Sequence, residues 1–189
     1  MTPQQIIDRA KTLIEAEIEG ITDPTWTAEM LEQWYQDAQD DLMLKVINEK
    51  LYFLYTTSTT ITTSGEYVRD ADFVKLILAT RVNKPCFPKM IEQSKNSLFN
   101  ATTEFPTVLL KEDKIIIEPL DTVDAQVIYI RKPKFELNTE SEIPKDWQYL
   151  IPNYICAKAL QKDKQETRAS YYKSLFDEGI AVINGKNST

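Results

Sequence analysis

The sequence contains no histidine, and this absence excludes several classes of catalytic site. A Ser-His-Asp triad, a Cys-His pair, a histidine-ligated metal centre and a histidine pH switch all require an imidazole. Only two cysteines occur, Cys86 and Cys156, which are too few for a zinc site built from thiolates alone. The four glycines are scattered, so neither of the glycine-rich phosphate-binding motifs can be written.

Long hydrophobic runs are also missing. No stretch approaches the ~18 apolar residues that a membrane span requires. The first residues, Met1-Thr2-Pro3-Gln4-Gln5, contain no basic region followed by an apolar stretch, so we expect no signal peptide. We therefore expect a cytosolic origin, in which both thiols stay reduced.

What is present is enough to build a globular fold. The chain has 189 residues, of which 42% are hydrophobic, so it can bury a core without disulfides. Its 22 basic and 29 acidic residues give a net charge of −7. Proteins that bind nucleic-acid phosphates are normally basic, so the acidic net charge argues against nucleic-acid binding as the function.

Helical patterns occupy both ends of the chain. Thr2, Pro3 and Gln5 predict a capping box at the start of a first helix. A second helix is predicted to begin near Asp23-Pro24 or at Thr27, and to end near Asn48. Beyond Pro144 or Pro152, apolar residues return at helical spacing in two stretches, with a polar turn over 162–165 between them. These features predict a helical bundle.

The middle of the chain is rich in β-branched and aromatic residues, which favour strands. Strands are predicted over 51–57, 59–63, 66–68, 73–80, 108–110, 114–118 and 125–130. We therefore expect an α+β fold in which an antiparallel β-sheet or small sandwich is inserted into the helical bundle. The expected division is 1–49 for the N-terminal helices, 50–135 for the β-rich domain, 143–184 for a C-terminal helical hairpin packing on the N-terminal helices, and 185–189 for a polar tail.

Few residues suggest chemistry. Asp37, Asp40 and Asp41 share one turn of the second predicted helix and could hold Mg²⁺ or Ca²⁺. The other interpretation is a solvated helix face, and we assign no metal or catalytic residue. Cys86 lies between two prolines without a cationic setting, as expected of an inert packing cysteine.

The order of motifs resembles the head-to-tail connector, or adaptor, proteins of tailed bacteriophages. The similar segments are Trp34-Tyr35 in the helical pair, Thr56–Thr63 followed by Gly65-Glu66-Tyr67, Asp72-Phe73, Ile115–Pro119, Ile128–Pro133, Ile143–Pro152 and Ala157–Leu160. One departure is the missing Leu-Pro before Asp72-Phe73. None of these motifs is chemically specific, so the resemblance depends on their order along most of the chain.

The resemblance implies a structural virion protein without enzymatic activity or cofactor. It implies a homo-oligomeric ring, typically of twelve copies, between the portal protein and the next tail or ring protein, through which DNA passes without specific binding. The location would be the neck or tail of the virion, after synthesis in the cytoplasm of the bacterial host. The alternatives are a metal-dependent enzyme using the aspartate cluster and a monomeric binding module.

Two sets of residues are predicted to contact partners. The polar tail has no role in a core and is predicted to bind the portal, through Asn184, Gly185, Lys186, Asn187, Ser188 and Thr189. A predicted hairpin over Thr56–Glu66 and the basic end of a later strand are expected at a subunit or tail interface. The residues of this second set are Thr57, Thr59, Thr60, Ile61, Thr62, Arg131 and Lys132.

Overall fold

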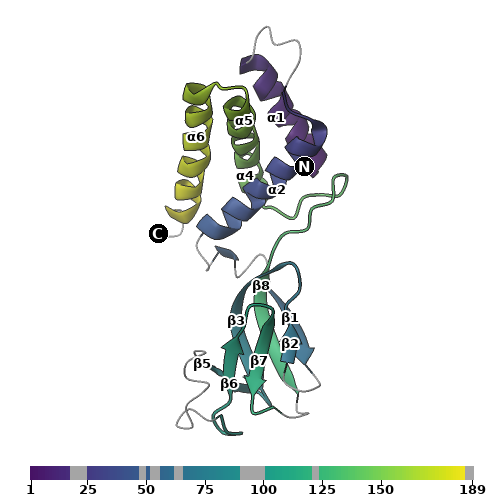
Figure 1. The fold of residues 1–189 in the computed structure, drawn as a ribbon, viewed down its shortest axis with the longest axis vertical. Helices are drawn as coiled ribbons and strands as arrows, with labels where there is room; N and C mark the ends of the chain where they lie inside the picture. Colours follow the sequence, from purple (N-terminus) through teal and green to yellow (C-terminus); the bar gives the residue numbers. More distant parts are fainter. Residues whose placement is uncertain are drawn as a thin grey trace. The chain divides into compact units, whose positions relative to one another are not determined.

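A computed structural model describes residues 1–17, 25–46, 50–51, 56–61, 66–89, 101–120 and 124–185. The fold is α+β, as the sequence predicts (Figure 1). The chain divides into two compact units. One is helical and combines Met1–Lys50 with Pro133–Thr189; the other is built from strands and spans Leu51–Lys132.

The helical unit begins with two helices whose starts are specified locally. Helix α1 (Pro3–Glu17) follows the predicted capping box: Gln5 N donates to Thr2 Oγ1 at 3.3 Å, and Thr2 N donates to Gln5 Oε1 at 3.0 Å. Helix α2 (Ala28–Lys45) begins after Thr27, whose side chain accepts from Met30 N. It ends at Lys45, three residues before the predicted Asn48.

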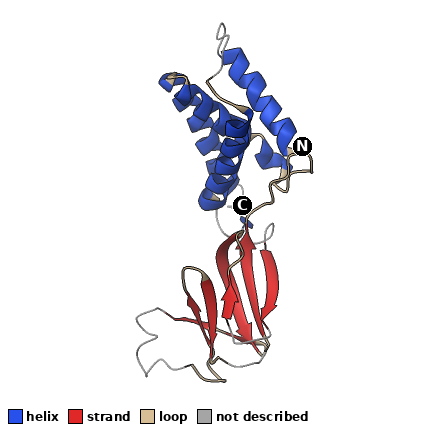
Figure 2. Cartoon of the chain, turned by 45° about the vertical axis from the view of Figure 1, so that its right-hand side comes forward, coloured by secondary structure: helices blue, strands red, loops and turns tan. Residues whose placement is uncertain are grey.

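The C-terminal helices are a short α4 (Lys145–Gln148), α5 (Leu150–Lys162) and α6 (Glu166–Gly185). Helix α5 is the central one, since it contacts α1, α2 and α6, and α5 and α6 lie side by side in both ribbon views (Figure 2). Its buried residues face all three neighbours and include Leu150, Ile151, Ile155, Cys156 and Leu160. Burial on several sides explains why α5 shows little helical amphipathicity in the sequence.

The strand unit contains two four-stranded sheets (Figure 2). The first has the order β1-β8-β3-β4, and the second has the order β2-β7-β6-β5. The strands are β1 (Thr56–Ile61), β2 (Glu66–Val68), β3 (Phe73–Arg81), β4 (Lys84–Pro85), β5 (Phe87–Lys89), β6 (Thr107–Leu110), β7 (Lys114–Glu118) and β8 (Ala125–Arg131). One core holds the sheets together, with Ala79, Val127 and Tyr129 from the first sheet and Val108, Ile115 and Ile117 from the second.

Three expectations about the strands are wrong in detail. Leu51 is helical, so the strand predicted from Leu51 begins at Thr56 instead. The predicted Thr56–Glu66 hairpin does not form, because β1 pairs with β8 whereas β2 pairs with β7 in the other sheet. The sheets are also not purely antiparallel, since β5 and β6 are parallel. The last two differences concern which strands pair, and packing on a shared core decides this pairing whereas local composition does not.

A polar contact also joins the two sheets. Asp70 Oδ2 accepts hydrogen bonds from the hydroxyls of Tyr67, on β2, and Tyr129, on β8; the Tyr129 bond is 2.6 Å long. The Tyr129 and Tyr67 hydrogen bonds hold the pKa of Asp70 below its ordinary value. This carboxylate therefore links one strand of each sheet.

Candidate interaction surfaces

Four charged side chains, two lysines and two aspartates, form a network of ion pairs between α2 and α6. Lys45 Nζ lies 3.0 Å from Asp41 and 2.8 Å from Asp177. Lys173 Nζ lies 3.1 Å from Asp41 and 3.4 Å from Asp177. Each lysine therefore contacts both carboxylates, and two of the four ion pairs, Lys45–Asp177 and Lys173–Asp41, join the two helices.

This network of ion pairs changes the interpretation of Asp37, Asp40 and Asp41 as a possible metal site. Burial raises the pKa of Asp41, but hydrogen bonds from Lys45 and Lys173 outweigh it and hold the pKa below its ordinary value. Asp37 accepts a hydrogen bond from Gln33 at 3.0 Å. Within the described ranges, no group of three or more acidic, cysteine or histidine residues is arranged to hold a metal ion. Asp41 thus serves α2–α6 packing, and nothing in these contacts favours the metal-dependent alternative.

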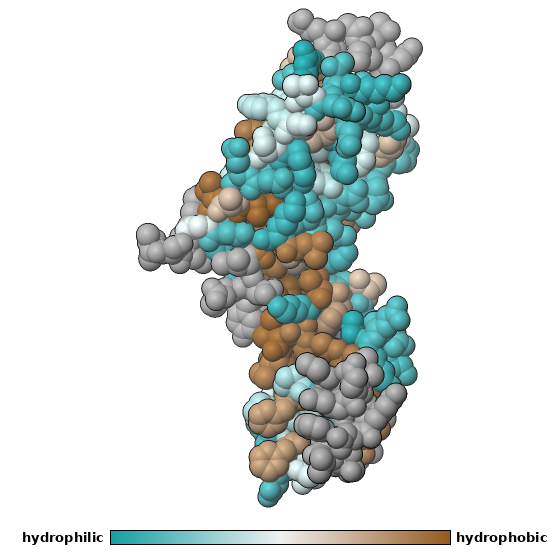
Figure 3. Space-filling view, turned by 60° about the vertical axis from the view of Figure 1, so that its left-hand side comes forward, coloured by the Kyte–Doolittle hydropathy of each residue, from teal (hydrophilic) through white to brown (hydrophobic). Residues whose placement is uncertain are grey.

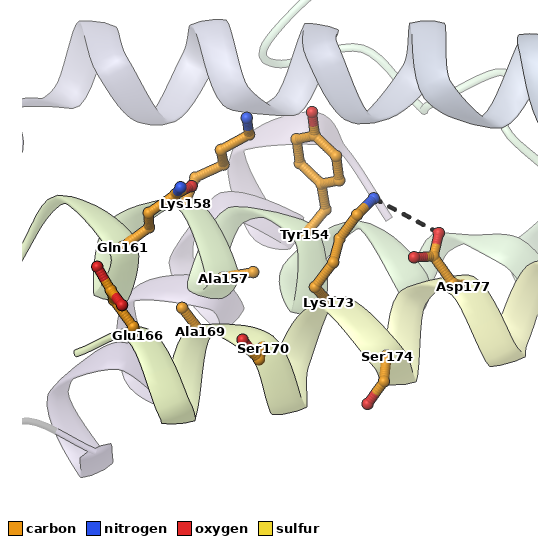
Figure 4. A pocket seen from close by; sticks show the side chains of 10 residues that line it. All are labelled: Tyr154, Ala157, Lys158, Gln161, Glu166, Ala169, Ser170, Lys173, Ser174 and Asp177. Atoms are coloured by element: carbon orange, nitrogen blue, oxygen red, sulfur yellow. Dashed lines mark hydrogen bonds and ion pairs between the residues drawn. The ribbon is translucent and has the colours of Figure 1, made fainter. Parts of the chain in front are cut away.

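A cavity of about 610 Å³ lies between α5 and α6 (Figure 4). Its lining is mixed: Lys158 Nζ lies 5.4 Å from the centre of the Tyr154 ring, and Lys173 Nζ lies 5.1 Å from it. Ser174 Oγ donates to Tyr171 O in its own helix at 2.8 Å, so this hydroxyl is not paired with a base. The arrangement offers charged and hydroxyl groups for contact but no assembled nucleophile and base.

Two residues of the predicted portal-binding tail belong to α6 instead. Asn184 and Gly185 are the last residues of α6, and Asn184 Nδ2 donates to Lys45 O at 3.0 Å. This bond ties the end of α6 to the end of α2. Lys186, Asn187, Ser188 and Thr189 lie outside the described residues.

The second predicted contact set falls on two neighbouring strands, the outer strand β1 and the end of β8. Thr57, Thr59, Thr60 and Ile61 belong to β1, whose first residue, Thr56, pairs with Ile130 next to Arg131. Arg131 ends β8, and its Nη1 donates to Lys132 O at 3.0 Å. Lys132 N donates to Asp72 O at 2.7 Å, so the main chain of this basic pair is anchored to the sheet. Thr62 lies outside the described residues.

Sequence reasoning missed several exposed apolar residues on the strand unit. Val82 is 52% exposed, Phe87 53%, Phe105 63% and Leu120 57%. Val82 occupies the β3–β4 turn with a φ of 49°, where a β-branched residue is unfavourable. Figure 3 shows hydrophobic residues on this unit, whereas hydrophilic residues cover most of the helical unit on that side. Isolated apolar residues carry no periodic signal, so the sequence could not single them out.

The described parts of the chain form two units of different construction, one helical and one built from strands. No described helix is long and apolar enough to cross a membrane. The fold defines an α+β protein, and the described residues show no assembled catalytic or metal site.

The family model of the SU10 adaptor protein matches residues 1–189, so the chain belongs to this family of phage head-to-tail adaptors. It is accordingly a structural adaptor of a bacteriophage virion, which assembles with other virion proteins. No curated protein matches the chain.

Proposed function

We propose that the chain forms a ring of twelve copies, the number that the family resemblance implies, between the portal and the tail. The ring lines the channel through which DNA passes. The observation that carries this proposal is the match of the adaptor family to the whole chain. A ring is built from one heterologous contact repeated until the rotation closes, so each copy needs two different faces. In this role the protein binds and positions other proteins and catalyses no reaction.

The charge of the chain suits a DNA conduit. Each copy carries a net charge of −7, and in the proposed ring part of this charge faces the channel. Acidic walls repel phosphates within about one Debye length, ~8 Å at physiological salt. DNA would therefore pass through without adhering to the wall. The absence of a strongly basic composition agrees with this function, because specific DNA binding usually relies on lysine and arginine.

The end of α6 is the proposed portal contact, through Asn184, Gly185, Lys186, Asn187, Ser188 and Thr189. The hydrogen bond from Asn184 to Lys45 O supports a fixed base for this segment. The β1 edge and the adjoining end of β8, with Thr57, Thr59, Thr60, Ile61, Thr62, Arg131 and Lys132, are the proposed subunit or tail contact. The two surfaces belong to different units, so substitutions in one need not disturb the folding of the other.

Negative-stain imaging of the chain mixed with its portal tests the ring. The portal contact is tested by deleting 186–189, because a cut after Gly185 keeps α6 and the Asn184 bond. We expect the shortened chain to retain its helical circular dichroism and melting temperature but to lose docking on the portal. A matched control replaces 186–189 with a Gly-Ser segment of equal length, which preserves length but not side chains. Docking by the shortened chain at full-length affinity would refute the assignment.

A further inference from the structure

The strand unit has four outer strands, and two of them carry proline where an outward N–H would otherwise be. Directly after β4, Cys86 N donates to Ala79 O at 2.8 Å, so Pro85, the last residue of β4, turns its nitrogen away from β3. On β5, Phe87 N donates to Pro106 O at 2.9 Å, so Pro88 turns its nitrogen away from β6. Proline at these positions removes the donor that an added strand would need.

The other two outer strands differ from each other. Strand β2 has only three residues and includes Glu66, whose carboxylate contacts Lys114 Nζ at 3.2 Å. Strand β1 has six residues, and its sequence Thr-Thr-Ser-Thr-Thr-Ile contains neither proline nor charge. Short length and charge are two ways in which proteins protect sheet edges from further pairing. Among the described outer strands, β1 is thus the one without such protection.

The hydrogen-bond pattern shows which β1 groups face outward. On β3, Ala79 directs its main-chain groups toward β4, because its carbonyl oxygen accepts from Cys86 N. Its antiparallel partner on β8, Val127, therefore directs its own N–H and C=O away from β3 and toward β1. Val127 pairs with Thr59, so Thr59 bonds inward and the neighbouring Ser58 faces away from β8. By the same alternation, the residues whose N–H and C=O groups face away from β8 are Thr56, Ser58 and Thr60. No described strand pairs with that side of β1.

We propose that this β1 edge accepts an extended segment of another virion protein as an additional strand, held mainly by main-chain hydrogen bonds. Such strand addition derives its affinity from the backbone groups of an open edge. The partner is a different chain because the other outer strands of a second copy, β2, β4 and β5, have three residues or fewer, and β4 and β5 also carry proline. Pairing of β1 with β1 of another copy would give a closed dimer instead. The inference rests on the proposed adaptor function and specifies how its β1 surface works.

The test uses three substitutions in the full-length chain. Ser58→Pro removes an outward N–H and leaves the β1–β8 bonds intact, whereas Ser58→Ala keeps that N–H and removes only the hydroxyl. Thr59→Pro removes an inward N–H and should disrupt β1. Heads from a phage that lacks the protein are incubated with each purified variant and then with purified tails, and tailed particles are counted. We expect Ser58→Ala to match the unaltered chain and Ser58→Pro to dock on heads but join tails at least about tenfold less well.

Hydrogen exchange supplies a second measurement that does not depend on a proline variant folding. The amides of Ser58 and Thr60 should exchange rapidly in the isolated chain and become protected in tailed particles. Equal tail joining by folded Ser58→Pro and Ser58→Ala, or unchanged exchange at both amides, would overturn the proposal. A β1-dependent dimer of the isolated chain that Ser58→Pro abolishes would overturn the choice of partner. Failure of the unaltered chain to dock on heads would instead count against the adaptor function itself.

Discussion

Replacing Gly179 with alanine should reveal how tightly α5 and α6 pack. Gly179 lies within α6 and faces Leu150, the first residue of α5, which is 0% exposed. A Cβ on Gly179 would overlap Leu150 Cδ2 and lie 3.1 Å from both Cγ and Cδ1. The Leu150 side chain therefore has to move as a whole, in a site without exposed surface into which it could turn.

Two effects of opposite sign determine the magnitude. Alanine is favoured over glycine inside a helix by about 1 kcal/mol. Overpacking a filled site costs about 1–3 kcal/mol, and the overlap with Leu150 places this substitution toward the upper end. Gly179→Ala should thus lower the free energy of unfolding of the helical unit by about 1–2 kcal/mol. In a Leu150→Ala background the overlap is gone, so the same substitution should stabilise by about 1 kcal/mol.

Urea unfolding followed by tryptophan fluorescence provides the assay, because Trp26, Trp34 and Trp147 all belong to the helical unit. The four proteins of the double-mutant cycle should show a coupling energy of about 2–3 kcal/mol between the two positions. Leu150→Ala alone controls for the cavity, with an expected loss of about 2–5 kcal/mol. The packing argument is refuted if Gly179→Ala stabilises the unaltered chain, or if its effect is equal in both backgrounds.

Two further predictions concern titrating groups. Because the folded pKa of Asp70 is depressed, its stabilising contribution should be present above the ordinary carboxyl pKa of about 3.9 and lost as the pH falls below it. Asp70→Asn should remove about 1 kcal/mol at neutral pH and weaken this acid dependence, measured by near-ultraviolet circular dichroism of the tyrosines; an unchanged acid limb would contradict it. Burial raises the pKa of Cys86 to about 11 and that of Cys156 to about 12, so both thiols should resist a disulfide reagent at pH 8 and react only in urea. Rapid reaction of either thiol in the folded chain would show that its burial is wrong.

The predictions that the structure confirms depend on neighbours in sequence. Thr2 and Gln5 are three residues apart, and Thr27 directly precedes α2, so their caps form within a single turn. Strand β7 likewise follows from a run of β-branched residues, since these favour a pleated backbone wherever the strand pairs. Local propensity of this kind can be predicted without knowledge of the fold.

The contact surfaces could not be predicted in the same way. Asp41 resembled a metal ligand because the sequence shows its acidic neighbours but not Lys173, which α6 brings to 3.1 Å from a position 132 residues away. The assignment of Thr57 and Thr60 to an interface depends on a predicted hairpin whose exposed strands could pair with another chain. The sequence does not indicate which residues of β1 face outward, because that depends on pairing with β8.

The amino-acid sequence by itself therefore determined the α+β class, the helix starts and the segments able to form strands, because short-range sterics and hydrogen bonding control them. Only the tertiary structure decided that β1 joins β8 while β2 joins the other sheet. The physical reason is that distant strands pair according to how their side chains fill one shared core, which has no local signature. The open edge of β1 is a consequence of that choice.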